Sequence, residues 1–142
     1  MPDKDSPRTA AWLLMGLTGS APGVLQIVDG RLSYIVHGRG ALTGAQLKEL
    51  ERRTGRSGLA EELGNGAVVT LFDVPLEAVG SVVFPWYYFG GGMKLTAAKV
   101  GYRFSFLKPQ NTQEWPGVAD IPEGRAAGKA WRRVLASSVS GT

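Results

Sequence analysis

Residues 67–108 constrain the fold of this chain more than any other stretch, because they contain almost no helix-forming signal. Short apolar and β-branched runs alternate there with residues that favour turns. The expected strands lie at 68–72, 79–84, 93–97 and 102–107, and the expected turns at 73–75, 90–92 and 99–101. This pattern predicts an antiparallel meander and therefore a mainly β protein.

The clearest local feature is a hairpin around Asp29 and Gly30. Apolar and polar residues alternate on both sides of this pair, at 24–28 and at 32–36. A two-residue type I′ turn needs positive φ at both central positions, and Asp followed by Gly tolerates this. Before the hairpin, we expect a loose polar tail at 1–9, a strand at 11–17 and a turn at 20–23.

Residues 43–66 interrupt the strand pattern with helical signals. Thr43 and Gln46 form a capping-box pair at the start of a first helix. The apolar stripe of this otherwise charged helix consists of Leu47 and Leu50, and a second short helical turn follows. Because the insert has so little apolar surface, we expect it on the outside of the sheet.

A second and stronger helix is expected at 121–138. Asp120 and Glu123 form another capping pattern, and Pro122 stands in the first turn, where its missing N–H costs nothing. One side of this helix carries the stripe Ala127, Trp131, Val134, Leu135 and Ser138. The other side carries the basic residues Arg125, Lys129, Arg132 and Arg133.

Size and composition are those of one globular domain. The chain has 142 residues, of which 44% are hydrophobic and 20% charged, which is enough for a substantial core. We expect a flexible tail at 1–9 and a single domain at 10–139. Cysteine is absent, which excludes disulfides, thiol nucleophiles and cysteine-based metal sites and fits a reducing compartment.

The sequence predicts no membrane-spanning helix, because it contains no run of about 20 apolar residues. Residues 10–17 resemble the apolar part of a short signal peptide, but Asp3 and Asp5 offset the positive charge ahead of them. The first strand of the sheet is the better interpretation of this stretch. We therefore expect a cytoplasmic protein, with a peripheral membrane location as a further option.

Positive charge is concentrated in the last third of the chain. Residues 1–92 carry 8 basic and 9 acidic side chains, whereas residues 93–142 carry 8 basic and 3 acidic ones. This distribution favours anionic partners such as phospholipid headgroups, acidic protein surfaces or nucleic acid. A solvated basic face that serves solubility is equally compatible with it.

Three segments of the β-rich part carry a family resemblance, namely 71–83 (LFDVPLEAVGSVV), 92–95 (GMKL) and 102–106 (YRFSF). Together with the final amphipathic helix, they resemble the pleckstrin-homology (PH) superfold, and more closely the GRAM-like and bacterial PH-like domains. The resemblance implies a bent antiparallel β-sandwich or barrel capped by a carboxyl-terminal α-helix. The helical insert departs from this family. Arg31 is the only basic residue of the first hairpin, so specific phosphoinositide recognition is not implied.

Consecutive aromatic residues precede the glycines at 90–92. They are Trp86, Tyr87, Tyr88 and Phe89. Because successive side chains of a strand point to opposite faces, these rings cannot all enter one core. Exposed rings beside a glycine turn suit a membrane interface or a protein-binding surface. The alternative is ordinary core, covered by the insert or by a second copy of the chain.

The glycines Gly38, Gly40 and Gly44 imitate a dinucleotide-binding turn between a strand and a helix. Their spacing is GxGxxxG, and the preceding strand belongs to an alternating hairpin, so a flexible entry to the insert is the preferred interpretation. His37 is the only histidine, which excludes a catalytic triad and a two-histidine metal site.

We therefore expect a non-enzymatic binding module without a cofactor, which engages a partner protein or an anionic membrane surface. The expected contact residues are Trp86, Tyr87, Tyr88, Phe89, Lys94, Lys99, Arg125, Lys129, Arg132 and Arg133. A small nucleotide-dependent oxidoreductase that uses the glycine turn and nucleic-acid binding through the basic last third stay open as alternatives, as does self-association. Nucleic acid is disfavoured because the aromatic residues at 102–106 have the spacing of a buried face.

Overall fold

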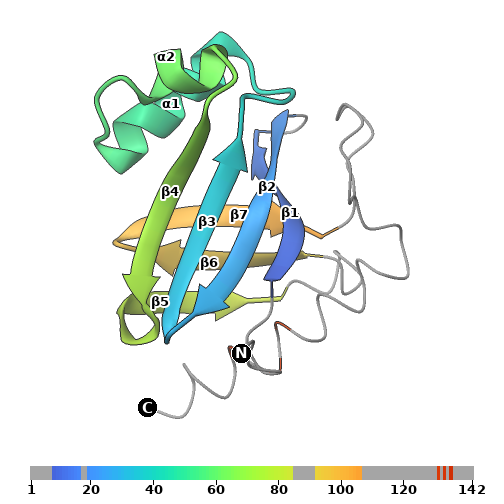
Figure 1. Cartoon of the computed structure of the whole chain (residues 1–142), viewed down its shortest axis with the longest axis vertical. Helices are drawn as coiled ribbons and strands as arrows, with labels where there is room; N and C mark the ends of the chain where they lie inside the picture. The colour runs from blue at the N-terminus through green and yellow to red at the C-terminus, as the bar shows by residue number, and fades with distance from the viewer. Residues whose placement is uncertain are drawn as a thin grey trace.

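One curled antiparallel sheet dominates the computed structural model, which describes residues 8–16, 19–84 and 92–106 together with residues 131, 133 and 135. Its strands are β1 (Arg8–Met15), β2 (Gly19–Val28), β3 (Arg31–His37), β4 (Val68–Pro75), β5 (Val79–Val83), β6 (Gly92–Ala97) and β7 (Val100–Ser105). They pair in the order β4-β3-β2-β1-β7-β6-β5. Strands β1 to β4 run across β5 to β7, so the sheet curls into a half-barrel (Figure 1). The prediction of a mainly β fold is confirmed.

The hairpin expected at Asp29 and Gly30 is confirmed. Both residues have positive φ, 53° and 74°, and the flanking Val28 and Arg31 pair with each other. This turn joins β2 to β3 with no residue besides Asp29 and Gly30. The turn therefore fixes the pairing register of the two strands, and with it the face to which each side chain points.

The β6–β7 turn lies one residue earlier than expected. Ala98 and Lys99 form it, with φ of 51° and 68°, while Val100 and Gly101 already belong to β7. Glycine at 101 suggested the wrong position, because glycine is the residue that usually supplies positive φ. Strand pairing imposes the left-handed conformation on an alanine and a lysine instead. Of the turn expected at 90–92, Gly92 begins β6, and the other two positions lie outside the described residues.

The turn expected at 20–23 is wrong, because these residues belong to β2. Pro22 pairs with Trp12 of β1, and pairing with β3 starts only at Gly23. At Pro22 the strand thus has a sheet neighbour on one side, where a missing N–H is tolerated. The tail also ends earlier than expected, since Arg8 and Thr9 belong to β1.

The turn expected at 73–75 is wrong as well. Strand β4 continues to Pro75, and the chain bends at the 3-10 turn η1 (Leu76–Ala78). Asp73 lies in the strand, where its carboxylate accepts a hydrogen bond from the guanidinium of Arg31 at 2.8 Å. This contact joins neighbouring strands that are far apart in sequence.

The helical insert expected at 43–66 contains α1 (Gly44–Thr54) and α2 (Leu59–Gly64). The capping box of α1 is formed, since Gln46 N donates to Thr43 Oγ1 at 3.1 Å and Thr43 N donates to Gln46 Oε1 at 3.0 Å. Figure 1 shows both helices beyond the ends of β3 and β4.

The insert does not lie outside the sheet as expected, because its leucines complete the core. Leu47 and Leu50 of α1 and Leu59 and Leu63 of α2 are buried in the same cluster as the inward side chains of the strands. A half-barrel leaves the core open at its end, and even a thin apolar stripe gains free energy by covering it. The small number of leucines therefore reflects a small area to cover.

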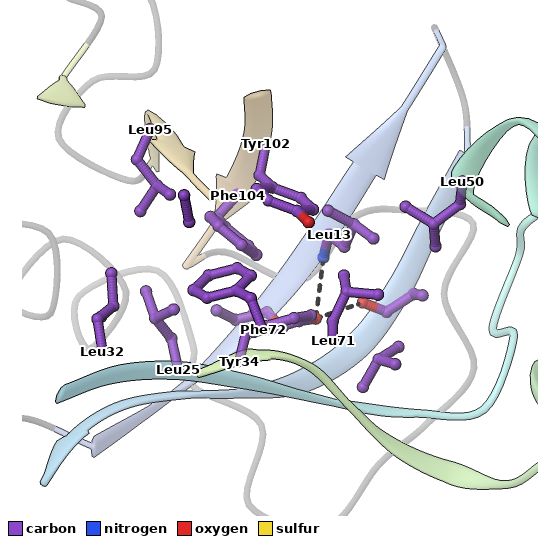
Figure 2. Packing of buried hydrophobic residues seen from close by; sticks show 14 of the residues in the cluster. Leu13, Leu25, Leu32, Tyr34, Leu50, Leu71, Phe72, Leu95, Tyr102 and Phe104 are labelled. Carbon is purple, nitrogen blue, oxygen red and sulfur yellow. Dashed lines mark hydrogen bonds between the residues drawn. The ribbon is translucent and has the colours of Figure 1, made fainter. Parts of the chain in front are cut away.

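Aromatic rings fill the inside of the curled sheet. Tyr34 and Phe104 have ring centroids 4.7 Å apart, and Phe72 and Tyr102 have centroids 4.9 Å apart (Figure 2). The Tyr34 hydroxyl accepts a hydrogen bond from Leu13 N at 3.2 Å and lies 2.9 Å from the carbonyl oxygen of Ala11. These contacts hold β3 against β1 through the core.

Part of the helix expected at 121–138 is described. Residues 131, 133 and 135 have helical backbone, with Trp131 and Leu135 fully buried. The indole of Trp131 is nearly parallel to the ring of Phe106, at 7°, and its Nε1 donates to Thr9 Oγ1 at 3.1 Å. These contacts anchor Trp131 to the start of β1 and the end of β7.

Candidate functional site

The outer face of β5, β6 and β7 carries the basic side chains of this half of the sheet. Along β6, Met93 and Leu95 are buried while Lys94 between them is partly exposed. Along β7, Phe104 is buried while Arg103 is partly exposed. This alternation follows from the two-residue period of strands, which sends neighbouring side chains to opposite faces.

Lys94 and Arg103 lie directly opposite each other on β6 and β7. Val83 of β5 is the next residue on one side of this pair, and Leu14 of β1 is the next on the other. The Lys94–Arg103 pair therefore places two cations next to each other on this face, which makes it a candidate for binding an anionic group.

Arg103 is held in place by the backbone at the end of β1. Its Nη2 donates to the carbonyl oxygen of Gly16 at 2.8 Å. This hydrogen bond fixes the guanidinium at the end of β1 and uses one of its five N–H donors. The site thus combines the anchored guanidinium of Arg103 with the ammonium group of Lys94.

A shallow groove of about 240 Å³ runs over this face, here called the β5–β7 groove. Its lining includes Ser81, Val83, Lys94, Thr96, Gly101 and Arg103. Two hydroxyls and two cations can bind an anionic group, while Val83, 49% exposed, offers apolar contact. Tyr102 also borders the groove, and burial raises its pKa to about 12, so its hydroxyl is neutral near pH 7.

The structure places some of the predicted contact residues and not others. Lys94 lies in the β5–β7 groove. Lys99 is exposed at the β6–β7 turn, outside the described lining of the groove. Arg133 is exposed and has helical backbone. The remaining predictions fall outside the described residues, namely Trp86, Tyr87, Tyr88, Phe89, Arg125, Lys129 and Arg132.

Sequence reasoning left Ser81, Val83, Thr96 and Arg103 out of the site. Arg103 carried a usable signal, because it alternates with aromatic residues that the sequence assigns to a buried face, and Tyr102, Phe104 and Phe106 are indeed buried. Its position opposite Lys94 depends on how β6 and β7 pair. That pairing follows from the position of the turn, which the sequence placed one residue too late.

The glycines at the entry to the insert have structural roles. Gly38 and Gly40 have positive φ, 82° and 55°, and a Cβ atom on Gly40 would lie 2.7 Å from the carbonyl oxygen of Ser20. Strands β3 and β4 are antiparallel neighbours, whereas a dinucleotide-binding unit needs parallel strands. The Gln46 amide in the first turn of α1 is also capped by the Thr43 hydroxyl, so this geometry does not favour the oxidoreductase alternative.

A second hollow, of about 730 Å³, lies between α1 and α2. Its lining mixes the basic Arg39 and Lys48 with the acidic Glu51 and Glu61. Glu51 is used within the insert, since its Oε1 accepts a hydrogen bond from Ala60 N at 3.0 Å. The mixed charges give this hollow no clear preference for one kind of ligand.

The described part of the chain contains no group of three histidine, aspartate or glutamate residues that could hold a metal ion. Within those same ranges, no helix is long and apolar enough to cross a membrane. No protein-family model, curated protein or solved structure matches this chain.

Proposed function

We propose that this protein is a non-enzymatic binding module of PH-like architecture, which engages an acidic partner protein through the β5–β7 groove. The Lys94–Arg103 pair carries the proposal. Two cations lie directly opposite each other across β6 and β7, and an acidic group that binds between them is attracted to both.

The fold supports the PH-like part of the proposal. The seven strands are antiparallel, and their two groups, β1–β4 and β5–β7, are joined by pairing between β1 and β7. Buried Trp131 and Leu135 suit a carboxyl-terminal helix that caps the half-barrel beside Phe106. In such an architecture the core is closed at both ends, which leaves surfaces rather than the interior for ligands.

The chemistry of the groove favours binding over catalysis. Its polar side chains are the two cations Lys94 and Arg103 and the hydroxyl residues Ser81, Thr96 and Tyr102. General acid–base catalysis needs a group that exchanges protons near neutral pH, such as a histidine or a perturbed carboxylate. A protein partner is preferred to a membrane because the groove combines the cations with hydroxyls and one valine, a mixture typical of a protein interface rim.

Affinity capture from native lysate tests this function with three forms of the protein. Wild-type protein is compared with Lys94→Glu and with the matched control Lys48→Glu, which reverses an exposed lysine on α1. We expect specific proteins to bind the wild type and the control, and to be lost with Lys94→Glu or in high salt. Removing one charged contact at an interface weakens binding by roughly tenfold or more.

Two results would contradict the proposal. One is capture that does not change with Lys94→Glu. The other is Lys94-dependent sedimentation with phosphatidylserine- or phosphatidylglycerol-rich vesicles in the absence of any Lys94-dependent protein capture, which would assign the groove to a membrane surface.

A further inference from the structure

Among the described residues, strand β5 is an edge of the sheet without a charged or proline residue, and its pairing with β6 is irregular only between Val79 and Val82. Only β6 pairs with it, so alternate N–H and C=O groups of β5 point away from the described sheet. Its five residues, Val79–Val83, include neither a charged residue nor a proline. Gly80, Ser81 and Val83 are exposed. Charges and prolines are the usual means by which edges are kept from pairing.

The other edge of the sheet, β4, is protected in several ways. The guanidinium of Arg56 donates a hydrogen bond to the carbonyl oxygen of Thr70, so one backbone group of this edge is occupied. Asp73 pairs with Arg31, which places opposite charges on the edge. Pro75 ends the strand without an N–H. The contrast between the two edges singles out β5 as the place where a partner strand fits.

We propose that the partner binds as an added strand beside β5, through an extended segment in which acidic and apolar residues alternate. This inference rests on the function proposed above and specifies how the partner is held. Backbone hydrogen bonds to β5 supply the pairing, and the cations of the β5–β7 groove select the acidic side chains.

The charge pattern follows from the cross-strand order. Val83, Lys94 and Arg103 lie in one row on the outer face, so a residue added opposite Val83 faces the same side. It would lie two strand spacings, roughly 10 Å, from the Lys94 backbone, which long lysine and glutamate side chains together can span. The outward residues of the added strand are therefore acidic.

The inward residues of the added strand are apolar for a related reason. Val82 pairs with buried Leu95 and packs against the core. Val74 and Leu76, near the opposite edge, also pack against this core. Side chains of an added strand that alternate with the acidic ones point toward this apolar region. A partner segment of alternating valine and glutamate meets both requirements.

A second copy of this chain fits β5 less well than an acidic segment does. Strand β5 contains no acidic residue, so β5–β5 pairing would bring no carboxylate from the strand toward Lys94. It would instead extend two sheets whose outer rows both carry cations. Charge complementarity thus favours a different polypeptide.

The test uses short acetylated peptides and the full chain labelled with ¹⁵N. One peptide alternates valine and glutamate, and a second alternates valine and lysine. Two further versions of the glutamate peptide carry N-methyl groups, on the valine amides in one and on the glutamate amides in the other. In a bound strand only alternate amides face β5, so one methylated version must lose binding while the other keeps it.

We expect the glutamate peptide to shift the amide resonances of Ser81, Val82 and Val83 at millimolar concentration and to slow their hydrogen exchange. The lysine peptide and one N-methylated version should bind roughly tenfold more weakly or not at all. Val83→Glu should block binding, because it places a carboxylate opposite the acidic side chains of the added strand, whereas Val68→Glu, at an exposed valine of β4, should leave it unchanged. Thermal unfolding confirms that both variants fold.

Each other outcome overturns the proposal. If both methylated peptides bind alike and shift only Lys94 and Arg103, strand addition is wrong while the binding function stands. If the glutamate and lysine peptides bind equally, the acidic partner is wrong. A dimer that Val83→Glu dissociates would assign the edge to self-association. If no peptide perturbs β5, strand addition is wrong, and lysate capture with Lys94→Glu still decides the proposed function separately.

Discussion

The hydroxyl oxygen of Tyr34 occupies the space that a side chain on Gly23 would need, since a Cβ atom on Gly23 would lie 2.5 Å from it. From this position the hydroxyl reaches Leu13 N at 3.2 Å and the carbonyl oxygens of Ala11 and Ala21 at 2.9 Å and 3.1 Å. One side chain of β3 thus joins the backbones of β1 and β2 inside the core, and glycine at position 23 makes room for it.

Replacing Tyr34 by phenylalanine should destabilise the protein although the ring is retained. The change leaves the amide of Leu13 and a carbonyl group without a partner in a buried site, at a cost of about 1–3 kcal/mol. Urea denaturation measures the free energy of unfolding. Tyr102→Phe is the control, because burial rather than hydrogen bonding sets the pKa of its hydroxyl. Equal losses in both variants would contradict the role assigned to the Tyr34 hydroxyl.

Gly23→Ala should destabilise the protein even apart from the clash with the Tyr34 hydroxyl. The added Cβ atom would also lie 2.4 Å from the carbonyl oxygen of Ile35, and backbone cannot move away as a flexible side chain can. Overpacking of this kind costs about 1–3 kcal/mol. Gly44→Ala is the matched control, since nothing lies within 4 Å of its added atom. The prediction fails if the two variants unfold at the same urea concentration.

The β6–β7 turn should be stabilised by residues suited to positive φ. Ala98 and Lys99 have φ of 51° and 68°, and the left-handed conformation costs an ordinary residue roughly 1–2 kcal/mol. The double variant Ala98→Asn with Lys99→Gly should therefore raise the midpoint of thermal unfolding. Gly30→Ala, at φ 74° with free space around it, should lower that midpoint and serves as the opposite control. A lower midpoint for the double variant would show that the turn is not limited by φ.

Alkaline pH should unfold the protein through its buried tyrosines. Burial raises the pKa of Tyr34 above its ordinary value of 10.0 and that of Tyr102 to about 12. Because these pKa values are higher in the folded state, stability is fully present below about pH 10 and is lost as pH rises from there through 12. The loss is at most about 1.4 kcal/mol per pH unit for each tyrosine. Denaturation series between pH 8 and 12 measure it.

The control for this pH dependence is Tyr34→Phe. The variant retains Tyr102 but lacks one of the two groups, so its stability should decline less steeply above pH 10. An identical slope in wild type and variant would mean that Tyr34 does not ionise on unfolding in this range.

Gln46 should couple the insert to the sheet. Its Oε1 accepts from Thr43 N, and its Nε2 donates to the carbonyl oxygen of Met15 at 3.1 Å. Gln46→Glu keeps the cap but loses the donor, so it should destabilise the protein by about 1 kcal/mol and speed amide exchange in α1. Gln46→Ala loses both contacts and should cost more. If Gln46→Glu behaves as wild type, the bond to Met15 does not hold the insert.

Much of the local structure could be predicted because it depends on residues close together in the chain. The Asp29–Gly30 turn and the Thr43–Gln46 capping box each need only a few residues, and both are formed. The alternation that buries Met93 and Leu95 and turns Lys94 outward likewise follows from strand geometry alone. The outward position of Lys94 could therefore be predicted from the sequence.

Other features depend on contacts between distant residues, and there the local signals were misleading. Asp73 is a residue type common in turns, but it lies in β4, where its carboxylate pairs with Arg31. Pro22 suggested a turn, but β2 tolerates it because the pairing of β2 with β3 starts only at the next residue, Gly23. The leucines of the insert seemed too few for a core, yet the open end of the half-barrel buries them.

By itself, the sequence determined the mainly β class, the first hairpin, the capped helix of the insert and the outward position of Lys94. Only the tertiary structure decided that Arg103 lies opposite Lys94, that β5 is an edge without charges and that β4 is the protected edge. The physical reason is the range of the interactions. Turns, caps and alternation arise from neighbouring residues, whereas strand partners and edges arise from long-range pairing, which also depends on how the whole core packs.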